Sequence, residues 1–485
     1  MNGSTACPTT YDRLFIGGRW VAAETDATVP VVNPHTEQPI GVIPDASAED
    51  VDRAVAAART SFEQGHWRRS APAERAPFFT ALAEAFKEHS AAIAEITTLE
   101  MGCPISQSMM INGALPQMQL DYYAAMAGEL DLEERRVGPL GTTIVRREPA
   151  GVVGAIVPWN GPIYLALNKV LPALIAGCSV VLKPAPEASL GLLRLAEIIQ
   201  SAGLPDGVLN VVTAGREAGE HLVTHPGVDR VSFTGSSAAG RRVAALCGER
   251  LKRVGLELGG KSAAIVLDDA DLSSTVEGLL PACLANSGQI CAAQTRILVS
   301  ERRHDEVVDA LAGAVGSMKV GDPADPATDV GPLASSRQRD RVEGYIALGR
   351  DHGATTVLGG GRPAGLPAGW YVEPTIFTGV TNDMRIAREE IFGPVLAVIR
   401  YRDEAEAVAI ADDSEFGLAG SVWTADVDRG LEVARSVRVG SYGVNTYTSD
   451  VNVPFGGSKA SGIGREGGPE GIEEYFEPKS IKLPY

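Results

Sequence analysis

The residue best suited to covalent chemistry is Cys291, in the stretch "NSGQICAAQTR". An apolar helical pattern over 271–286 precedes it and the run "RILV" follows, so we expect Cys291 on a loop between a helix and a strand. An accessible thiolate in such a place is a nucleophile. The alternative interpretation is a small buried apolar side chain, as most cysteines are. We expect that alternative for the other cysteines, which are Cys7, Cys103, Cys178, Cys247 and Cys283.

A second candidate is Glu257, in the stretch "GLELGGKS" over 255–262, which fits the phosphate-loop pattern G-x-x-x-x-G-K-[ST] letter for letter. That pattern needs a helix directly after it, whose N-terminal N–H groups hold the phosphates. Here "AAIVLDDADL" follows, an apolar run that predicts a strand. A G-x-G-x-x-G match over 462–467 likewise lacks a preceding strand. We interpret both matches as coincidental, which leaves the role of Glu257 open; taken alone, it could be a solvated acid near a bend.

Five motifs occur in order along the chain: "PWN" at 158–160, "LELGGKS" at 256–262, "GQIC" at 288–291, "EEIFGPV" at 389–395 and "PFGGSKASGIGREGG" at 454–468. Together they resemble the aldehyde dehydrogenase superfamily, and the resemblance extends over nearly the whole chain. It implies an NAD(P)-dependent enzyme of the hydrolytic, non-acylating type, which oxidises an aldehyde to a carboxylic acid.

The resemblance implies a role for each of five side chains. Cys291 would add to the aldehyde carbon to give a thiohemiacetal, which becomes a thioester when the hydride leaves. Asn160 would donate a hydrogen bond to the oxyanion, and Glu257 would activate the water that hydrolyses the thioester. Lys169 and Glu466 match positions that relay the proton from this base. The residues taken singly also allow Asn160 as a turn cap, and Lys169 and Glu466 as surface charges.

The cofactor site is expected around "VSFTGSSAAGRRVAAL", which reads as a strand, a Gly/Ser turn and a helix. Gly235 and Ser236 lie where the N–H groups of a helix N-terminus can meet a pyrophosphate, although Ser236 could equally be an ordinary N-cap. By resemblance Lys183, at the end of the strand "SVVLK", reaches the adenosine ribose. Many NAD-preferring relatives carry an acid where this chain has Pro186, and Glu187 comes one residue later. No arginine stands near Lys183 in the sequence to pair a 2′-phosphate, so NAD is favoured and NADP stays open.

Further residues match cofactor-binding positions, with Glu390 expected on the nicotinamide ribose and Phe392 against the ring. The others are Ile156, Val157, Pro158, Trp159, Gly215, Gly219, Phe233, Thr234 and Leu258.

The substrate tunnel is expected to be roomy and mainly apolar. Gly161 follows Asn160, where relatives with aromatic-lined tunnels often carry a large side chain. No arginine among the matching positions could hold a distal carboxylate. We predict an aromatic or medium-chain aliphatic aldehyde as the substrate. The other positions that match tunnel walls are Leu165, Asn168, Ile290, Ala292, Tyr447 and Phe455.

These residues must be positioned by an α/β fold. From Gly151 onward, short Val/Leu/Ile runs alternate with helical patterns, which predicts parallel strands in a doubly wound sheet, and a second α/β series runs over about 263–445. The resemblance implies a Rossmann-type cofactor domain over 1–126 and 150–259 and a catalytic domain over 260–445. It also implies a small β oligomerisation arm and tail over 127–149 and 446–485. Such an arm pairs strands with a neighbour, so a homodimer or homotetramer is expected.

Composition narrows the possible partners and location. The 485 residues carry a formal charge of −18, which repels nucleic acid and anionic membranes. The first residues lack the blocks of a signal peptide, and the apolar stretch 151–182 is interrupted by polar residues, so we expect a cytoplasmic protein without a membrane span. The cysteines form no C-x-x-C pair, so we expect neither a disulfide framework nor a metal site.

Three rival functions stay open on the sequence. A coenzyme A-acylating relative would keep Cys291, but it usually lacks the base at Glu257. A cysteine hydrolase needs a histidine partner, and the seven histidines lie in no recognisable catalytic motif. A catalytically silent binding or structural protein on the same fold would not need Cys291, Glu257 and Asn160 together.

Overall fold

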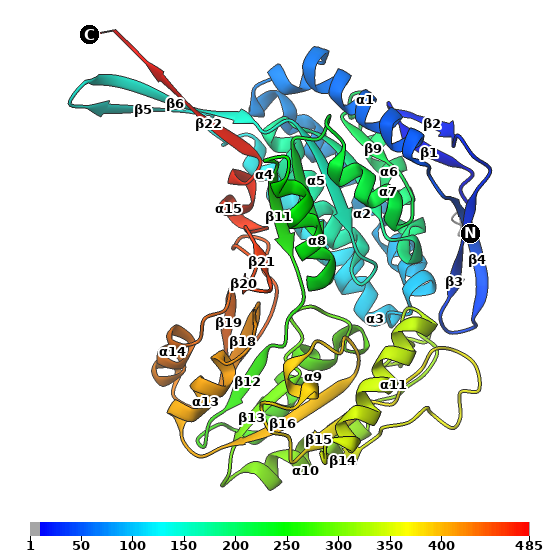
Figure 1. Cartoon of the computed structure of the whole chain (residues 1–485), viewed down its shortest axis with the longest axis vertical. Coiled ribbons are helices and arrows are strands. Elements are labelled where there is room, and N and C mark those ends of the chain that lie inside the picture. The colour runs from blue at the N-terminus through cyan, green and yellow to red at the C-terminus, as the bar shows by residue number, and fades with distance from the viewer. Residues whose placement is uncertain (1–9, 485) are drawn as a thin grey trace.

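Figure 1 shows a computed structural model of the chain, which describes residues 10–484. The larger of its two main sheets lies in the upper half of this view. This sheet has eight strands, and its five consecutive strands β9, β8, β7, β10 and β11 run parallel. In spatial order the strands are β2 (Arg19–Ala22), β1 (Arg13–Ile16), β9 (Leu209–Val211), β8 (Ser179–Pro184), β7 (Val152–Val157), β10 (Arg230–Thr234), β11 (Arg253–Glu257) and β21 (Gly462–Ile463).

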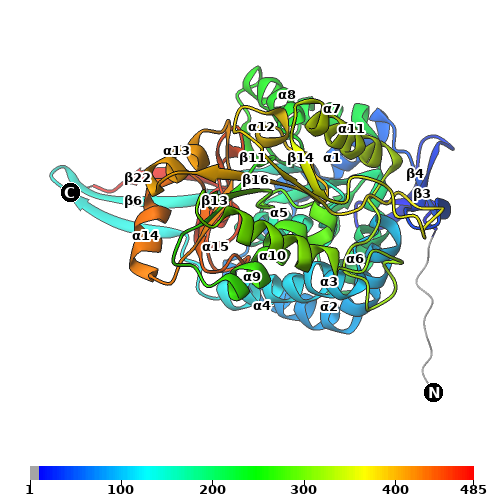
Figure 2. The ribbon, with the colours of Figure 1, turned by 90° about the horizontal axis from the view of Figure 1, so that it is seen from below.

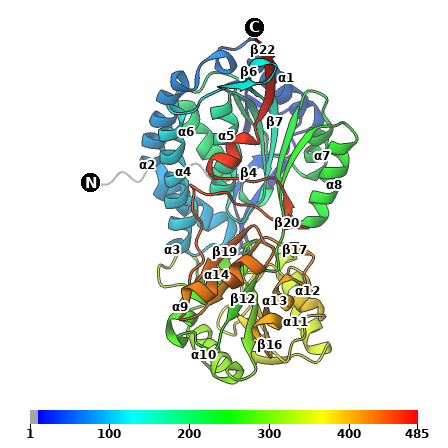
Figure 3. The same ribbon diagram turned by 90° about the vertical axis from the view of Figure 1, so that its left-hand side faces the viewer.

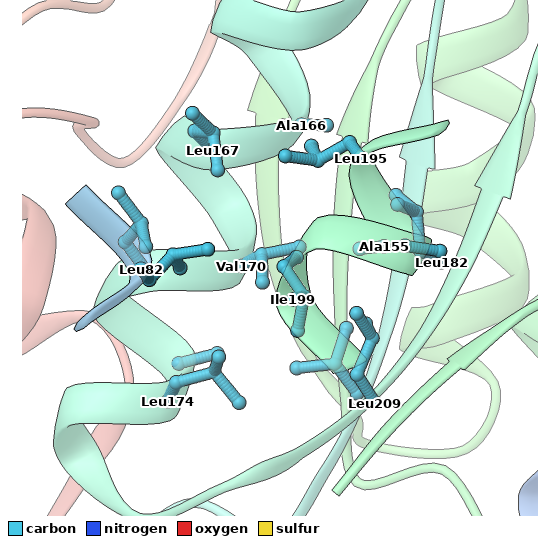
Figure 4. Packing of buried hydrophobic residues seen from close by; sticks show 14 of the residues in the cluster. Leu82, Ala155, Ala166, Leu167, Val170, Leu174, Leu182, Leu195, Ile199 and Leu209 are labelled. Atoms are coloured by element: carbon cyan, nitrogen blue, oxygen red, sulfur yellow. The ribbon is translucent and has the colours of Figure 1, made fainter. Parts of the chain in front are cut away.

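Helices cover both faces of this sheet because alternate strand residues point to opposite sides. Val153 and Ala155 of β7 pack in one apolar cluster, while Val152 packs in another. The first cluster is built on α2 (Pro72–Met101), α4 (Leu115–Ala127), α5 (Pro162–Ala176) and α6 (Leu190–Ser201). The second is built on α1 (Ala48–Gln64), α7 (Arg216–Thr224) and α8 (Ser237–Gly248). Figure 4 shows the first cluster, where side chains of α2, α5 and α6 meet those of β7, β8 and β9.

The second main sheet fills the lower half of Figure 1 and Figure 3. Its seven strands, in spatial order, are β14 (Thr355–Leu358), β15 (Thr375–Thr378), β16 (Val395–Tyr401), β13 (Arg296–Ser300), β12 (Ala263–Val266), β18 (Ala419–Trp423) and β19 (Ser441–Val444). Helices α9 (Leu272–Leu284) and α10 (His304–Gly316) pack on one face, and α11 (Ser336–Asp351), α13 (Glu404–Asp412) and α14 (Val427–Ser436) on the other. The site lies where the loops of the two sheets meet.

A three-stranded antiparallel sheet projects from the body, as Figures 1 and 2 show. It joins β22 (Phe476–Lys482) to β6 (Gly141–Pro149), which pairs in turn with β5 (Glu133–Gly138). The side chains of Val137 and Leu140 at its tip are 86% and 80% exposed. We call this sheet the arm.

Smaller elements complete the chain. They are the hairpin β3 (Thr28–Asn33) and β4 (Gln38–Pro44), the pair β17 (Phe416–Gly417) and β20 (Ser458–Lys459), the helices α3 (Ile105–Ser108), α12 (Arg385–Arg388) and α15 (Gly468–Glu473), the π-helix η2 (Met109–Ala114), and the 3₁₀ turns η1 (Trp67–Arg69), η3 (Pro186–Ala188) and η4 (Ala285–Gly288).

Local signals in the sequence set the ends of several helices. Helix α1 begins at the capping box of Ser47 and Asp50, and α2 ends at Gly102, whose φ of 80° suits glycine. Between α3 and α4 the chain forms the π-helix η2. Strand β12 follows Ser262, so the phosphate-loop interpretation is excluded.

The cysteine predictions are confirmed where the structure covers them, because Cys103, Cys178, Cys247 and Cys283 are buried free thiols. Cys7 lies outside the described residues. Within residues 10–484, no helix is long and apolar enough to cross a membrane.

Candidate active site

Cys291 lies on the loop between α9 and β13, as the sequence predicts. Just before it, Asn286 and Ser287 adopt φ values of 51° and 56°, in the left-handed region that non-glycine residues rarely occupy. Hydrogen bonds hold this backbone in place. The Ser287 hydroxyl donates to the Gly331 carbonyl at 2.9 Å, and the Ala334 N–H donates to the Gln289 side-chain oxygen at 3.0 Å. Contacts with the surrounding chain therefore hold the loop in a backbone conformation that its own residues do not favour.

The Cys291 side chain is partly exposed and packs beside an apolar cluster of Ala292, Leu418 and Ala419. Burial raises the pKa of this thiol to about 12, and the charges of Glu257 and Glu390 act in the same direction. The thiol is therefore neutral at neutral pH, and a base or a positive charge must act before it can attack a carbonyl.

Asn160, on the turn between β7 and α5, is buried and joins the two halves of the site. Its side-chain Nδ2 donates to the Gln289 carbonyl at 2.9 Å, and its own carbonyl accepts from Nδ2 of Asn286 at 3.0 Å. A side-chain amide has two N–H donors, so one is left to bind an oxyanion near Cys291. The capping alternative does not describe this residue, since Gly161 is the N-cap of α5 and lacks a side-chain cap.

Glu257 ends strand β11 and is only 5% exposed, so it is not a solvated acid. Neither of its carboxylate oxygens has a hydrogen-bond partner in the described part of the chain. Burial raises the pKa of Glu257 well above its usual value, and the charge of Glu466 raises it further against the opposing charges of Lys169 and Arg465. The room for this side chain depends on Gly456, because a Cβ there would lie 2.5 Å from Glu257 Oε1. Because its charged form is disfavoured, this carboxylate is a stronger proton acceptor than an exposed one, which suits a general base.

Lys169 and Glu466 form a buried ion pair beside Glu257, so neither is a surface charge. Lys169 lies on α5, and Glu466 is held by two backbone hydrogen bonds with Phe455, of 2.6 and 2.8 Å. The structure thus brings the expected proton-relay residues together around the expected base.

The expected ribose end of the cofactor site lies at the end of β8. Burial lowers the pKa of Lys183 to about 8, and the charges of Glu187 and Asp45 oppose this shift. A Cβ on Gly219 would lie 3.2 Å from Lys183 Cε, so this glycine leaves the lysine its room. The Gly215 N–H, at the start of α7, donates to Asp45 at 3.1 Å. Glu187 is 3.6 Å from Arg337 of the second half of the chain, a contact that the sequence did not predict.

The expected pyrophosphate end lies where β10 meets α8. Ser236 is the N-cap of α8 and accepts from the Ala239 N–H at 3.3 Å, so the ordinary-cap interpretation is correct for its side chain. A Cβ on Gly235 would lie 2.6 Å from the Phe233 ring, so only glycine fits there. The buried Thr234 hydroxyl has no partner among residues 10–484. The Leu258 side chain packs against Gly240 of α8.

The expected nicotinamide end lies between the two sheets. Trp159 meets Phe392 edge to face, with ring centroids 5.5 Å apart. Glu390 accepts from the Gly260 N–H at 3.1 Å, and burial raises the pKa of Glu390 to about 7. Ile156 is half-buried on β7, and Val157 and Pro158 lead from that strand toward Trp159. The glycines, the buried lysine and the helix N-terminus of these three places are groups that suit a dinucleotide.

The residues expected to line the substrate tunnel surround Cys291 on the remaining side. Ile290, Tyr447 and Phe455 pack with Cys291 on its apolar cluster. A Cβ on Gly161 would meet Ile111 and Leu165 at ordinary contact distances of 3.6 and 3.8 Å, so apolar side chains lie beside this position. Asn168 is buried, and its Oδ1 accepts from Gln119 of α4 at 2.6 Å.

Sequence reasoning missed several residues of this site. Tyr164 lies near Cys291 and Glu466, and burial raises its pKa to about 12. Asn286 and Gln289 build the Cys291 loop, and Gln119 orients Asn168. The stretch "NSGQIC" carried a signal for the loop residues, since polar side chains beside glycine are typical of turns. Nothing local marked Gln119 or Tyr164.

One group outside this site has metal-ligand chemistry. Asp52 Oδ1 lies 2.6 Å from His221 Nε2 and 3.3 Å from His225 Nε2. However, the Gly227 N–H donates to Nδ1 of His225 at 2.9 Å, which keeps the ring proton on Nε2. The Nε2 lone pair is then not available to an ion, so we interpret this group as a hydrogen-bonded contact between α1 and α7.

The chain is similar to known proteins over nearly its full length. The aldehyde dehydrogenase family model matches residues 20–481. The chain belongs to the aldehyde dehydrogenase family. It is 48% identical to geranial dehydrogenase of Castellaniella defragrans, over 98% of this chain and 99% of that protein. It is 41% identical to betaine aldehyde dehydrogenase 1 of Oryza sativa subsp. japonica, over 98% and 96% of the two chains.

Solved structures agree. An aldehyde dehydrogenase of Mycobacterium tuberculosis complexed with NAD+ superposes with a TM-score of 0.97 at 48% identity, over 98% of this chain and 99% of that chain. A mutant of aldehyde dehydrogenase C from Pseudomonas syringae, complexed with NAD+ and octanal, gives 0.94 at 40% identity, over 97% and 96%. The predicted family and fold class are thus confirmed, and this aldehyde dehydrogenase is an oxidoreductase that converts aldehydes to carboxylic acids.

Proposed function

We propose that Cys291 is the nucleophile of this aldehyde dehydrogenase and that Glu257 is its general base. The Cys291 thiol gives its proton to the Glu257 carboxylate, and the thiolate adds to the aldehyde carbon. The remaining amide N–H of Asn160 and the backbone N–H of Cys291 stabilise the oxyanion, and loss of such a donor costs about 2.7–4 kcal/mol. The observation that carries this proposal is the buried Glu257 carboxyl. It lacks a hydrogen-bond partner in the described residues, and its charge raises the pKa of the Cys291 thiol.

Hydrolysis completes the reaction at the same residues. Once Glu257 has lost its proton, it takes one from water, and the hydroxide adds to the thioester carbon. The Cys291 thiolate then leaves and is reprotonated, and the carboxylic acid is released. Glu466, which is paired with the Lys169 ammonium, receives the proton from Glu257.

We assign NAD as the cofactor, with NADP also possible, since a bound nicotinamide dinucleotide supplies the hydride acceptor that this oxidation needs. Lys183 and Glu187 would hold the adenosine ribose, the N-terminus of α8 the pyrophosphate, and Glu390 the nicotinamide ribose. The NAD+ complex of the Mycobacterium tuberculosis relative supports this assignment. The ion pair of Glu187 with Arg337 supports NADP as a second cofactor, because it offsets the acid that would repel a 2′-phosphate.

We propose an apolar aldehyde of medium length or an aromatic aldehyde as the substrate. The apolar side chains of Ile111 and Leu165 beside Gly161 support a tunnel with apolar walls. One relative is named as a geranial dehydrogenase, and a mutant of another was solved in complex with octanal, and both aldehydes are apolar.

The proposed organisation follows the sheets. The cofactor domain would comprise 1–126 and 150–259, the catalytic domain 260–445, and the arm and tail 127–149 and 446–485. The projecting arm supports a homodimer or homotetramer. The free cysteines of the described residues fit a reducing cytoplasm.

The decisive experiment follows reduced-nicotinamide absorbance after mixing the protein with NAD and octanal, geranial or benzaldehyde, and repeats the panel with NADP. We expect turnover that disappears in Cys291→Ala and persists in Cys247→Ala, a matched buried cysteine far along α8. Equal turnover in Cys291→Ala would refute the assigned nucleophile.

A further inference from the structure

A small cavity lies beside Glu257, between β11 and the C-terminal segment. Its volume is about 10 Å³, close to the space for one water molecule. Its walls are polar where Glu257, Glu466, Arg230 and Ser232 contribute and apolar at Leu256 and Ile463.

Four buried polar atoms of the walls have no hydrogen-bond partner in residues 10–484. They are both carboxylate oxygens of Glu257, Oε2 of Glu466 and Nε of Arg230. The three residues are 5%, 7% and 3% exposed. Burying such groups without partners costs several kcal/mol, so a site that gathers them is expected to hold a molecule that satisfies them. Water suits the cavity, because it offers two donors and two acceptors.

Arg230 is held in place on its far side. Its Nη2 donates to Glu474 at 2.8 Å, and its guanidinium lies 4.8 Å from the centre of the Tyr475 ring. A Cβ on Gly255, in the neighbouring strand, would lie 2.8 Å from Arg230 Nη2, so this glycine gives the guanidinium its room. The remaining Nε–H therefore has a fixed direction, and an arginine does not release its proton.

We propose that one water molecule in this cavity, oriented by Arg230, carries the proton from Glu257 to Glu466 during thioester hydrolysis. The water accepts from Arg230 Nε–H and from the protonated Glu257 carboxyl, and it donates to Glu466 Oε2. The Glu257 O–H bond breaks as the water takes this proton, and the water passes one of its own to Glu466, so water and Arg230 are unchanged. Arg230 acts through the water and is a positioning residue.

This inference rests on the proposed roles of Cys291 and Glu257. Its test measures acylation, in which the nicotinamide is reduced, separately from deacylation, in which water hydrolyses the thioester. The variant is Arg230→Met, which keeps the length of the side chain and removes its donors. The matched control is Arg253→Met, since Arg253 pairs with Arg230 across β10 and β11 and is half exposed. A single turnover is followed with octanal and NAD. Acylation is measured by the absorbance of reduced nicotinamide. Deacylation is measured by mass spectrometry of the intact protein, as the loss of the mass of the acyl group.

We expect Arg230→Met to form reduced nicotinamide at the wild-type rate but to lose the acyl group roughly ten-fold more slowly, less than the 100-fold or more of a general base. The solvent deuterium isotope effect on deacylation should rise, and Arg253→Met should match the wild type. A purely structural role of Arg230 would slow both stages or leave the isotope effect unchanged.

Two results would overturn the proposal: wild-type deacylation in Arg230→Met, or an ordered crystal structure of the wild type without water density in the cavity. The second measurement holds even if the variant does not fold. A wild-type protein that forms neither reduced nicotinamide nor an acyl adduct would instead refute the proposed function.

Discussion

At the scale of single residues, the site combines groups that are each poorly suited to act alone. Burial raises the pKa of Cys291 to about 12 and that of Glu257 well above its usual value, because the dry surroundings disfavour the charged form of each group. The charge of Glu257 adds to the shift of the Cys291 thiol, since two negative charges in one dry site are unfavourable. A carboxylate that is poorly solvated in this way is suited to take a proton from the nucleophile.

This coupling predicts the behaviour of Glu257→Gln. Removal of a negative charge stabilises the Cys291 thiolate, so the thiol pKa falls and alkylation by iodoacetamide reaches its half-maximal rate at a lower pH. The measurement is the alkylation rate of the unliganded protein between pH 6 and about 11, followed by mass spectrometry of Cys291. Glu187→Gln is the control and should leave the profile unchanged. A higher midpoint in Glu257→Gln would mean that the carboxyl does not act on the thiol.

At the scale of elements, helix α6 shows how distant segments complete one another. Its N-cap residue Ser189 makes no side-chain cap, because its hydroxyl donates to the Ala185 carbonyl. Glu100, at the end of α2, instead accepts from the N–H groups of Leu190 and Gly191 at 2.8 and 3.1 Å. Burial raises the pKa of Glu100 to about 8, although these two donors favour the charged form.

The sign of this shift predicts a pH dependence of stability. Between pH 4.5 and about 8, folded Glu100 keeps a proton that the unfolded chain has released, so its contribution falls as the pH rises through this window. The unfolding temperature of the wild type minus that of Glu100→Gln should therefore fall from pH 5 to pH 8, since glutamine does not titrate. Glu95→Gln, on the exposed face of the same helix, should follow the wild type. A difference that grows with pH would contradict a raised pKa.

The same contacts explain what the sequence could predict. Helices α1 and α2, the strand after Ser262 and the loop of Cys291 depend on local signals such as caps, glycines and apolar runs. The ion pair of Arg230 with Glu474 joins residues 244 positions apart, and Glu100 caps a helix 90 positions away. No local pattern encodes such pairs. The motif resemblance supplied the candidate residues, and only the packed fold shows which buried atoms face one another.

At the scale of the whole molecule, the arm is the feature that a single chain does not explain. Strand β5 lies at one edge of its three-stranded sheet, and all six of its residues are exposed. The apolar side chains of Val137 and Leu140 lie at the tip in solvent. An unprotected edge with exposed apolar residues favours association, because a neighbour can pair with it and cover it.

Charged substitutions at the tip should therefore weaken the proposed oligomer. We expect the double variant Val137→Asp with Leu140→Asp to lower the molar mass measured by light scattering, because two carboxylates would have to be buried against the neighbour. Val357→Asp is the matched control: this valine is 37% exposed on β14, at one edge of the second main sheet, and its replacement should leave the mass unchanged. An unchanged mass in the double variant would place the subunit contact elsewhere, and a single-chain mass in the wild type would remove the arm's assigned role.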